Sequence, residues 1–145
     1  FTVSHSITLV GTTLGFLGLP QNPVESVIAL SIMFLAVEIV KAKPGETRFS
    51  QRVPWLVAFL FGLLHGFGFA GALKEIGLPQ GEVPMALLTF NVGVEAGQLL
   101  IVMATLGVLA LVRRIAPLAL RPVTLGATYF IGIVASYWFI ERTFA

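Results

Sequence analysis

Long apolar runs constrain this chain more than any other feature of its sequence. Several of these runs contain no Lys, Arg or Glu and reach the roughly 18 residues that a helix needs to cross a bilayer. Only 11% of the residues are charged, whereas soluble domains carry about 25%. Because a backbone inside lipid must satisfy its own hydrogen bonds, such runs form helices. The sequence predicts an all-α, polytopic transmembrane helix bundle whose main contact is the lipid bilayer.

The apolar runs and their breaks predict five spanning helices within a single transmembrane domain. The expected helices cover residues of about 1–19, 23–40, 54–76, 84–112 and 122–144. Proline marks the start of four of them, where its missing N–H costs nothing, and Gly77 suits the end of the third. Because Phe1 already lies within an apolar segment, we expect a further part of the protein upstream.

The distribution of basic residues predicts the orientation in the membrane. The loops 41–52 and 113–121 hold seven Lys and Arg residues, while the other side holds only Lys74 and Arg142. We call the first of these the basic side and the other the opposite side. Since basic loops stay in the cytoplasm, we expect the basic side to be cytoplasmic, the C-terminus to lie outside, and the protein to sit in the inner membrane. Loop charges of this kind do not suggest nucleic-acid binding.

A histidine lies in the middle of the third predicted helix. The run Phe61–Ala70 is apolar except for His65, and Gly62, Gly66 and Gly68 surround it. An ionisable side chain at membrane depth is costly and is a functional-site hypothesis by default. The glycines are typical of close helix packing.

The depth of His65 matches that of a carboxylate on the next helix. His65 lies eleven residues before Ile76, and Glu95 lies eleven residues after Pro84. At 1.5 Å per residue, both side chains are about 16 Å from the opposite boundary of a core about 30 Å thick. We therefore expect His65 and Glu95 to meet. Asn91 and Gln98 share a helix face with Glu95 and would support them.

A second pair is expected closer to the basic side. His5 lies fourteen residues before Leu19, and Glu38 lies fifteen residues after Pro23. Both therefore lie roughly 21 to 22 Å from the opposite boundary. Each of the two histidines in the chain is thus expected to face a carboxylate.

Two interpretations of these polar groups remain open. The His and Glu side chains could bind a divalent metal ion or relay protons; nitrogen and oxygen donors without cysteine favour Ni, Co or Zn. Alternatively, they are interhelical hydrogen bonds worth around 1 kcal/mol each. An enzyme is not expected, because the chain has no Gly-x-Ser-x-Gly motif, no phosphate-binding loop and no Asp.

Four stretches of the sequence resemble the HupE/UreJ family, in particular its second HupE/UreJ-like branch. They are Phe1-Thr-Val-Ser-His5-Ser-Ile-Thr-Leu9, Phe61-Gly-Leu-Leu-His65-Gly-Phe-Gly-Phe-Ala70, Phe90-Asn-Val-Gly-Val-Glu95-Ala-Gly-Gln98-Leu99 and Tyr137-Trp138-Phe-Ile-Glu141-Arg142. The resemblance implies a hydrogenase or urease accessory protein of the membrane, or a nickel or cobalt permease, with His5, His65 and Glu95 as matching residues. The alternatives are a proton-coupled carrier of another solute and a non-transporting structural subunit of a larger complex. A membrane-protein partner or a homo-oligomer would suit the structural subunit.

Overall fold

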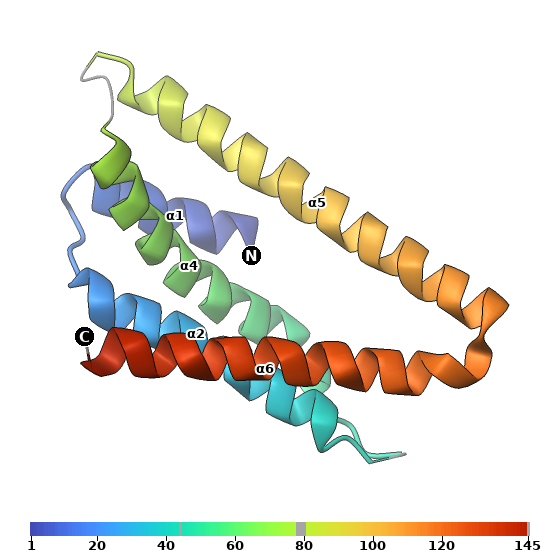
Figure 1. Cartoon of the computed structure of the whole chain (residues 1–145). Helices are drawn as coiled ribbons and strands as arrows, with labels where there is room; N and C mark the ends of the chain where they lie inside the picture. Colours follow the sequence, from blue (N-terminus) through green and yellow to red (C-terminus); the bar gives the residue numbers. More distant parts are fainter. Residues whose placement is uncertain (44, 78–80, 145) are drawn as a thin grey trace.

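The computed structural model describes residues 1–43, 45–77 and 81–144, and this part of the chain is helical without strands (Figure 1). The elements in order are α1 (Thr2–Thr13), α2 (Gln21–Val40), the short α3 (Phe49–Arg52), α4 (Pro54–Ile76), α5 (Val83–Ile115), the 3₁₀ turn η1 (Pro117–Ala119) and α6 (Leu120–Phe144). The predicted all-α class is confirmed.

Among the described residues, four segments, rather than the predicted five, are long and apolar enough to cross a membrane. They are α2, α4, α5 and the continuous stretch of η1 and α6. The expected helix over residues 1–19 ends at Thr13 in the structure. Gly15 takes a left-handed φ of +82°, and the N–H groups of Phe16 and Leu17 fold back onto the carbonyl of Gly11. Residues 14–19 are apolar, but hydropathy does not report the backbone turn that a glycine allows.

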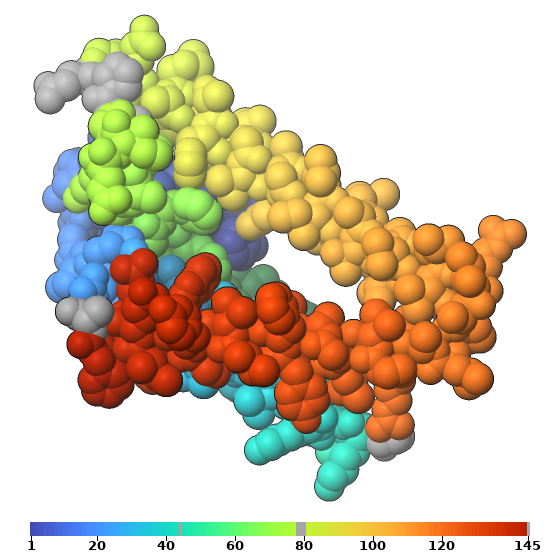
Figure 2. All heavy atoms as spheres, viewed as in Figure 1, coloured from blue at the N-terminus to red at the C-terminus, as the bar shows by residue number. Residues whose placement is uncertain are grey.

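The helices form a packed group from which α5 diverges. Figure 1 shows α2 beside α6 and α1 beside α4, with α2 also packed on α4. The connection from α2 to α4 and the turn from α5 to α6 lie at one end, which is the basic side. Along its 33 residues, α5 buries only Leu87, and Figure 2 shows an opening between α5 and α6.

Glycine allows α1 and α4 to come into backbone contact. A Cβ atom at Gly62 would overlap Ser4 Oγ, and one at Gly66 would overlap Thr8 Oγ1. Thr8 Oγ1 also donates a hydrogen bond to the carbonyl of Leu63, at 2.9 Å. Gly62 and Gly66 are four residues apart and lie on one face of α4, and Ser4 and Thr8 likewise share one face of α1. Each small residue on one helix therefore faces a small residue on the other.

The third glycine of the group faces a different helix. Gly68 lies about half a turn round α4 from Gly66, and a Cβ there would meet the end of the Ile28 side chain on α2. The glycines of α4 therefore bring α1 close on one face and α2 on another.

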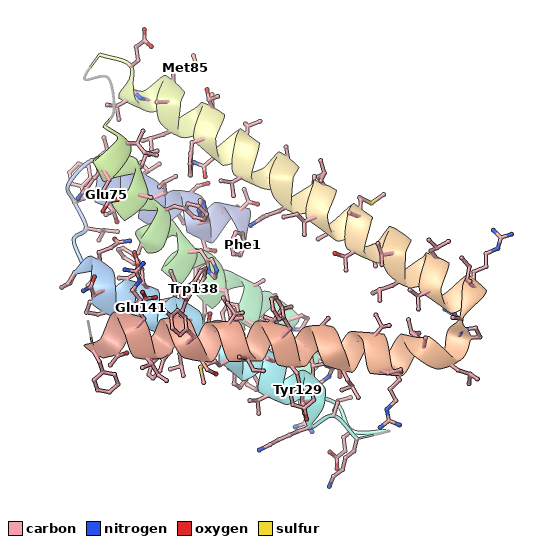
Figure 3. All side chains as sticks on the ribbon, viewed as in Figure 1. Phe1, Glu75, Met85, Tyr129, Trp138 and Glu141 are labelled. Carbon is pink, nitrogen blue, oxygen red and sulfur yellow. The ribbon has the colours of Figure 1, made fainter. Side chains whose placement is uncertain are left out.

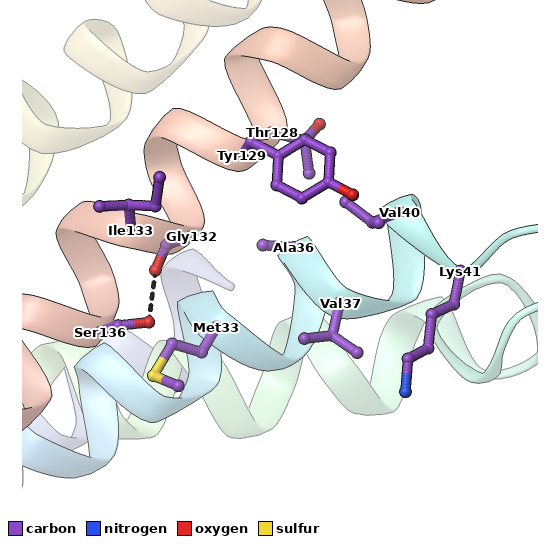
Figure 4. Close-up of a pocket in the computed structure, with 10 residues that line it drawn as sticks. All are labelled: Met33, Ala36, Val37, Val40, Lys41, Thr128, Tyr129, Gly132, Ile133 and Ser136. Carbon is purple, nitrogen blue, oxygen red and sulfur yellow. Dashed lines mark hydrogen bonds between the residues drawn. The ribbon is translucent and has the colours of Figure 1, made fainter.

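A shallow apolar groove lies on the outer surface, along the line where α2 packs against α6. It has a volume of about 220 Å³, and its lining includes Ala36, Tyr129 and Ser136 (Figure 4). A Cβ at Gly132 would lie 3.3 Å from that of Ala36, so the two helices approach closely at this point. Ser136 donates its hydroxyl proton to the carbonyl of Gly132 at 2.7 Å, which keeps its polar atom satisfied within α6.

An ion pair joins α6 to α2 at the opposite side. Arg142 Nε lies 2.8 Å from Glu25 Oε2, and Gln21 Nε2 donates to the other Glu25 oxygen at 2.8 Å. Gln21 also donates to the carbonyl of Gly68, which extends the contact to α4. This network connects three helices at one end of the molecule.

Replacing Arg142 with Ala should have only a small effect on stability. Both partners of the ion pair are partly exposed, at 47% and 30%, and exposed pairs contribute about 0.2–1 kcal/mol. We expect the unfolding free energy in detergent to fall by no more than about 1 kcal/mol. A chemical denaturation curve followed by circular dichroism measures it, and a much larger loss would show that the Glu25 network is essential to the α2–α6 contact.

Candidate functional site

The two histidines lie on different helices and share a neighbour. His5 on α1 is buried, with 1% of its surface exposed, and His65 on α4 is half-buried. The ring of Phe1 stacks on His5 with centroids 5.7 Å apart and meets His65 edge-on at 5.6 Å. Figure 3 shows Phe1 at the end of α1 that points into the middle of the molecule. The histidines therefore flank one aromatic ring.

The hydrogen bonds of Asn91 on α5 determine which nitrogen of the neutral His5 ring carries the proton. Asn91 Nδ2 donates to the carbonyl of Leu87 at 3.1 Å, so the amide oxygen faces α1. That oxygen lies 3.1 Å from His5 Nδ1 and also 3.1 Å from the hydroxyl of Ser6. Since an amide oxygen only accepts, Nδ1 carries the proton and donates it. In neutral His5, the Nε2 lone pair is then free.

His65 takes the same tautomer for a different reason. Its Nδ1 lies 2.7 Å from the carbonyl oxygen of Phe61, one turn earlier on α4. A carbonyl oxygen only accepts, so Nδ1 again donates and Nε2 is left with a lone pair. Both rings therefore offer Nε2, with Nδ1 held by an oxygen atom, as in most histidines that bind metals.

The Nε2 atom of His5 is buried and has no partner within the described residues. The ring of Phe69 packs against this imidazole with centroids 5.4 Å apart, and a phenyl ring has no N–H or O–H group to donate to the Nε2 lone pair. A buried polar atom without a hydrogen bond costs about 1–3 kcal/mol. An ion or a water molecule at this atom would remove that cost.

The expected contacts between histidines and carboxylates are not formed, which corrects the predicted pairing. Both oxygens of Glu38 accept from the backbone N–H of Ser50, at 3.3 Å, and so cap α3 instead of facing His5. Glu95 is exposed and makes no hydrogen bond or ion pair within the described part of the chain. The depth estimate for His5 was also wrong, because it counted along a helix to Leu19, whereas α1 ends at Thr13. Depth, moreover, does not determine which side of a helix a residue occupies.

The supporting residues Asn91 and Gln98 occupy separate places. Asn91 was expected beside Glu95 and His65, but it reaches α1 and holds His5. Gln98, two turns further along α5, lines a cavity together with His65. Because α5 diverges from the other helices, its successive polar residues face different neighbours.

Phe1 and Phe69 belong to this site although the sequence did not single them out, and Ser6, the neighbour of His5 in the sequence, belongs to it as well. Phe69 follows His65 by four residues, so the i, i+4 spacing could have placed its ring near the histidines. Nothing in the sequence indicated that Phe1 would contact both imidazoles.

The described residues contain no cluster of three or more His, Cys, Asp or Glu side chains that could hold a metal ion. What the structure brings together is two imidazoles with free Nε2 atoms, and two amide side chains, Asn91 and Gln98, near one or the other of them. Such a set could bind a transition metal loosely or relay protons, but it is not a closed structural site.

Four apolar helices and a pair of imidazoles near the centre of the bundle define a multi-pass membrane protein with a polar intramembrane site. The family model described as "HupE / UreJ protein" matches residues 1–142, so the chain belongs to the HupE/UreJ family and the resemblance is confirmed. Comparisons with curated proteins and with solved structures each gave no match.

Proposed function

We propose that this protein handles a divalent transition metal ion within the membrane, as a permease or as an accessory protein, through Nε2 of His5 and His65. The observation that supports this most strongly is the common tautomer: each Nδ1 donates to an oxygen, and each Nε2 is left with a free lone pair. At His5 that lone pair is buried and has no partner among the residues that the structure describes. Neutral imidazole held in this way is a typical metal ligand.

The chemistry of the available ligands favours Ni, Co or Zn as the ion. Imidazole nitrogen suits these metals, and the absence of cysteine from the sequence removes the thiolates that favour Cu(I). Membership of the HupE/UreJ family supports nickel among them and supports a role other than catalysis. The basic loops support a location in the inner membrane, with residues 41–52 in the cytoplasm.

The four other polar residues have unequal support as members of this site. Asn91 orients His5, and Gln98 offers an amide oxygen near His65. Glu95 is not engaged by any described residue, so its carboxylate could complete the coordination of an ion if α5 moved toward α4. Glu38 is the weakest candidate because the backbone of α3 already holds it.

A second candidate is a non-transporting membrane subunit that contacts a partner protein or another copy of the chain. The observation that favours it is the surface of α5, of which only Leu87 is buried. Cellular uptake of metal separates the two functions, since a subunit without transport activity would give no uptake even in the wild-type protein.

Substitution of the histidines should remove bound metal. We expect His5→Ala and His65→Ala each to weaken metal binding by at least about tenfold, because each removes one nitrogen ligand, and the double variant to bind no more than background. Elemental analysis of the purified protein and competition with a coloured chelator measure the affinity.

A matched control is Thr105→Ala on α5. Thr105 is exposed, and its hydroxyl only donates to the carbonyl of Ile101 in its own helix. This variant should keep wild-type metal content, and circular dichroism should show that all the variants are folded. If the double histidine variant retains the metal of the wild type, the proposed site is wrong.

A further inference from the structure

The largest cavity near the site lies between the helices and extends from the basic side to His65. Its volume is about 570 Å³, within the range of about 300–1,000 Å³ that is usual for ligand sites. Phe1 and His65 line it at its deep end, and Ser50 and Pro54 line it where α3 passes into α4. Pro54 to His65 is eleven residues, so the cavity extends about 16 Å along α4.

All four spanning helices contribute residues to this cavity. These residues come from the middle of each helix or from its half nearer the basic side. On α2 the lining begins at Ile32 and continues to Ile39, while α6 contributes Thr128 and Ile131 from its first half. Gln98 is the contribution of α5, from near its midpoint. The cavity therefore connects the basic side to the depth of His65 and does not extend beyond it.

In the opposite half of the molecule, apolar packing lies between the surface and His65. Leu9, Ala70, Leu73 and Leu87 form a buried cluster between α1, α4 and α5. A groove of about 400 Å³ enters from that half and reaches Ser6 and Asn91, but neither histidine lines it. Access to His65 is therefore asymmetric.

Most residues that line the cavity are apolar, but polar side chains lie among them at a depth where contact with lipid would be unfavourable. The side chain of Gln98 makes no hydrogen bond within the described part of the chain, although an amide without partners in hydrocarbon costs several kcal/mol (about 4–8 for transfer to a non-polar solvent). His65 lies further in, and Ser50 lies at the entrance. Water in the cavity would satisfy these groups, whereas acyl chains would not.

We propose that this cavity is a water-filled vestibule that opens to the basic side and ends at His65. On the proposed metal-handling function, which this inference extends, a hydrated divalent cation enters or leaves by this route. His65 is then the first nitrogen that the ion meets, and the ring of Phe1 lies between the vestibule and His5. The cavity thus leads from the basic side to His65, whereas the groove on the opposite side stops at Ser6 and Asn91.

Introduced cysteines test the vestibule, because the natural chain contains none and every added thiol is the only one. The test positions are Ala58→Cys and Ile131→Cys, which lie in the cavity wall. Their controls are the adjacent Phe59→Cys and Phe130→Cys, at similar depths, whose side chains are exposed but do not line the cavity, whereas the likewise exposed Ile131 does line it. The full chain is placed in vesicles and treated with a charged, membrane-impermeant methanethiosulfonate from each side separately.

Thiols at the two test positions should react when the reagent is on the basic side. Because lipid suppresses the reactive thiolate, the two control thiols should react at least about tenfold more slowly. Reagent on the opposite side should leave all four thiols unmodified. If the test thiols react as slowly as their controls, or react only with reagent on the opposite side, the proposal of a vestibule is wrong. This conclusion does not depend on the metal content of the protein.

Addition of Ni²⁺ before the reagent separates this inference from the proposed function. If Ni²⁺ slows labelling at Ala58→Cys and the His65→Ala substitution removes that protection, both are supported. If the test thiols react from the basic side but Ni²⁺ gives no protection and the protein binds no metal, the vestibule is supported and the metal function is wrong.

Discussion

Replacing Gly66 with Leu should separate α1 from α4 and abolish metal binding with it. Even a Cβ at this position would overlap Thr8 Oγ1 and the carbonyl of His5, and backbone atoms cannot rotate away as a side chain can. We expect a loss of about 3 kcal/mol or more of unfolding free energy, the upper part of the range for overpacked cores. Gly66→Ala should cost about 1–3 kcal/mol. Denaturation in detergent, followed by circular dichroism, gives these values.

The matched control is the same pair of substitutions at Gly97. This glycine lies in the middle of α5, and a Cβ there would meet nothing within 4 Å. Gly97→Ala should change the unfolding free energy by no more than about 1 kcal/mol, in the stabilising direction, because alanine favours a helix over glycine. If Gly66→Leu is as stable as Gly97→Leu, α1 does not pack on α4 as described.

Replacing Asn91 with Leu should weaken metal binding while leaving both histidines in place. The amide oxygen of Asn91 accepts the Nδ1 proton of His5, and without it the ring can adopt the other tautomer or rotate. Loss of an outer partner of this kind typically costs about 10–100-fold in metal affinity. Chelator competition measures the affinity, and the ¹⁵N chemical shifts of the imidazole report the tautomer directly.

Asn91→Asp is the conservative variant for this prediction. A carboxylate still accepts the Nδ1 proton of His5, so affinity should recover to within about tenfold of the wild type. A residue with only a packing role would give no such difference between Leu and Asp. If Asn91→Leu keeps wild-type affinity and tautomer, Asn91 does not position His5.

The spanning helices could be predicted from the sequence because hydropathy and helix-end residues act locally. Residues 54–76 were predicted as a helix and coincide with α4, since Pro54 suits the first turn and Gly77 takes a left-handed φ of +82°. The end of α1 was missed because the same kind of glycine turn, at Gly15, lies inside an apolar run. Composition predicts which residues enter lipid, but not where the helix inside that run stops.

The residues of the site were predicted better than their contacts. His5, His65 and Asn91 were singled out as polar side chains within apolar runs, and counting along the helices at 1.5 Å per residue added only an estimate of depth. Such counting gives neither the rotation of a helix about its axis nor its divergence from a neighbour. For this reason Asn91, rather than a carboxylate, proved to be the partner of His5. The tautomers depend on which oxygen faces each ring, and only the packed structure shows that.

The length of α5 links the gap between α5 and α6 to the thickness of the membrane around it. Its 33 residues extend about 50 Å, well beyond the roughly 30 Å of a hydrocarbon core. Tilting is one way to take up the surplus, and the tilt that this requires increases as the bilayer becomes thinner. Since α5 forms one border of the gap beside α6, the width of that gap becomes a function of lipid chain length. The thickness of the host bilayer, together with the sequence, then determines the distance between α5 and α6.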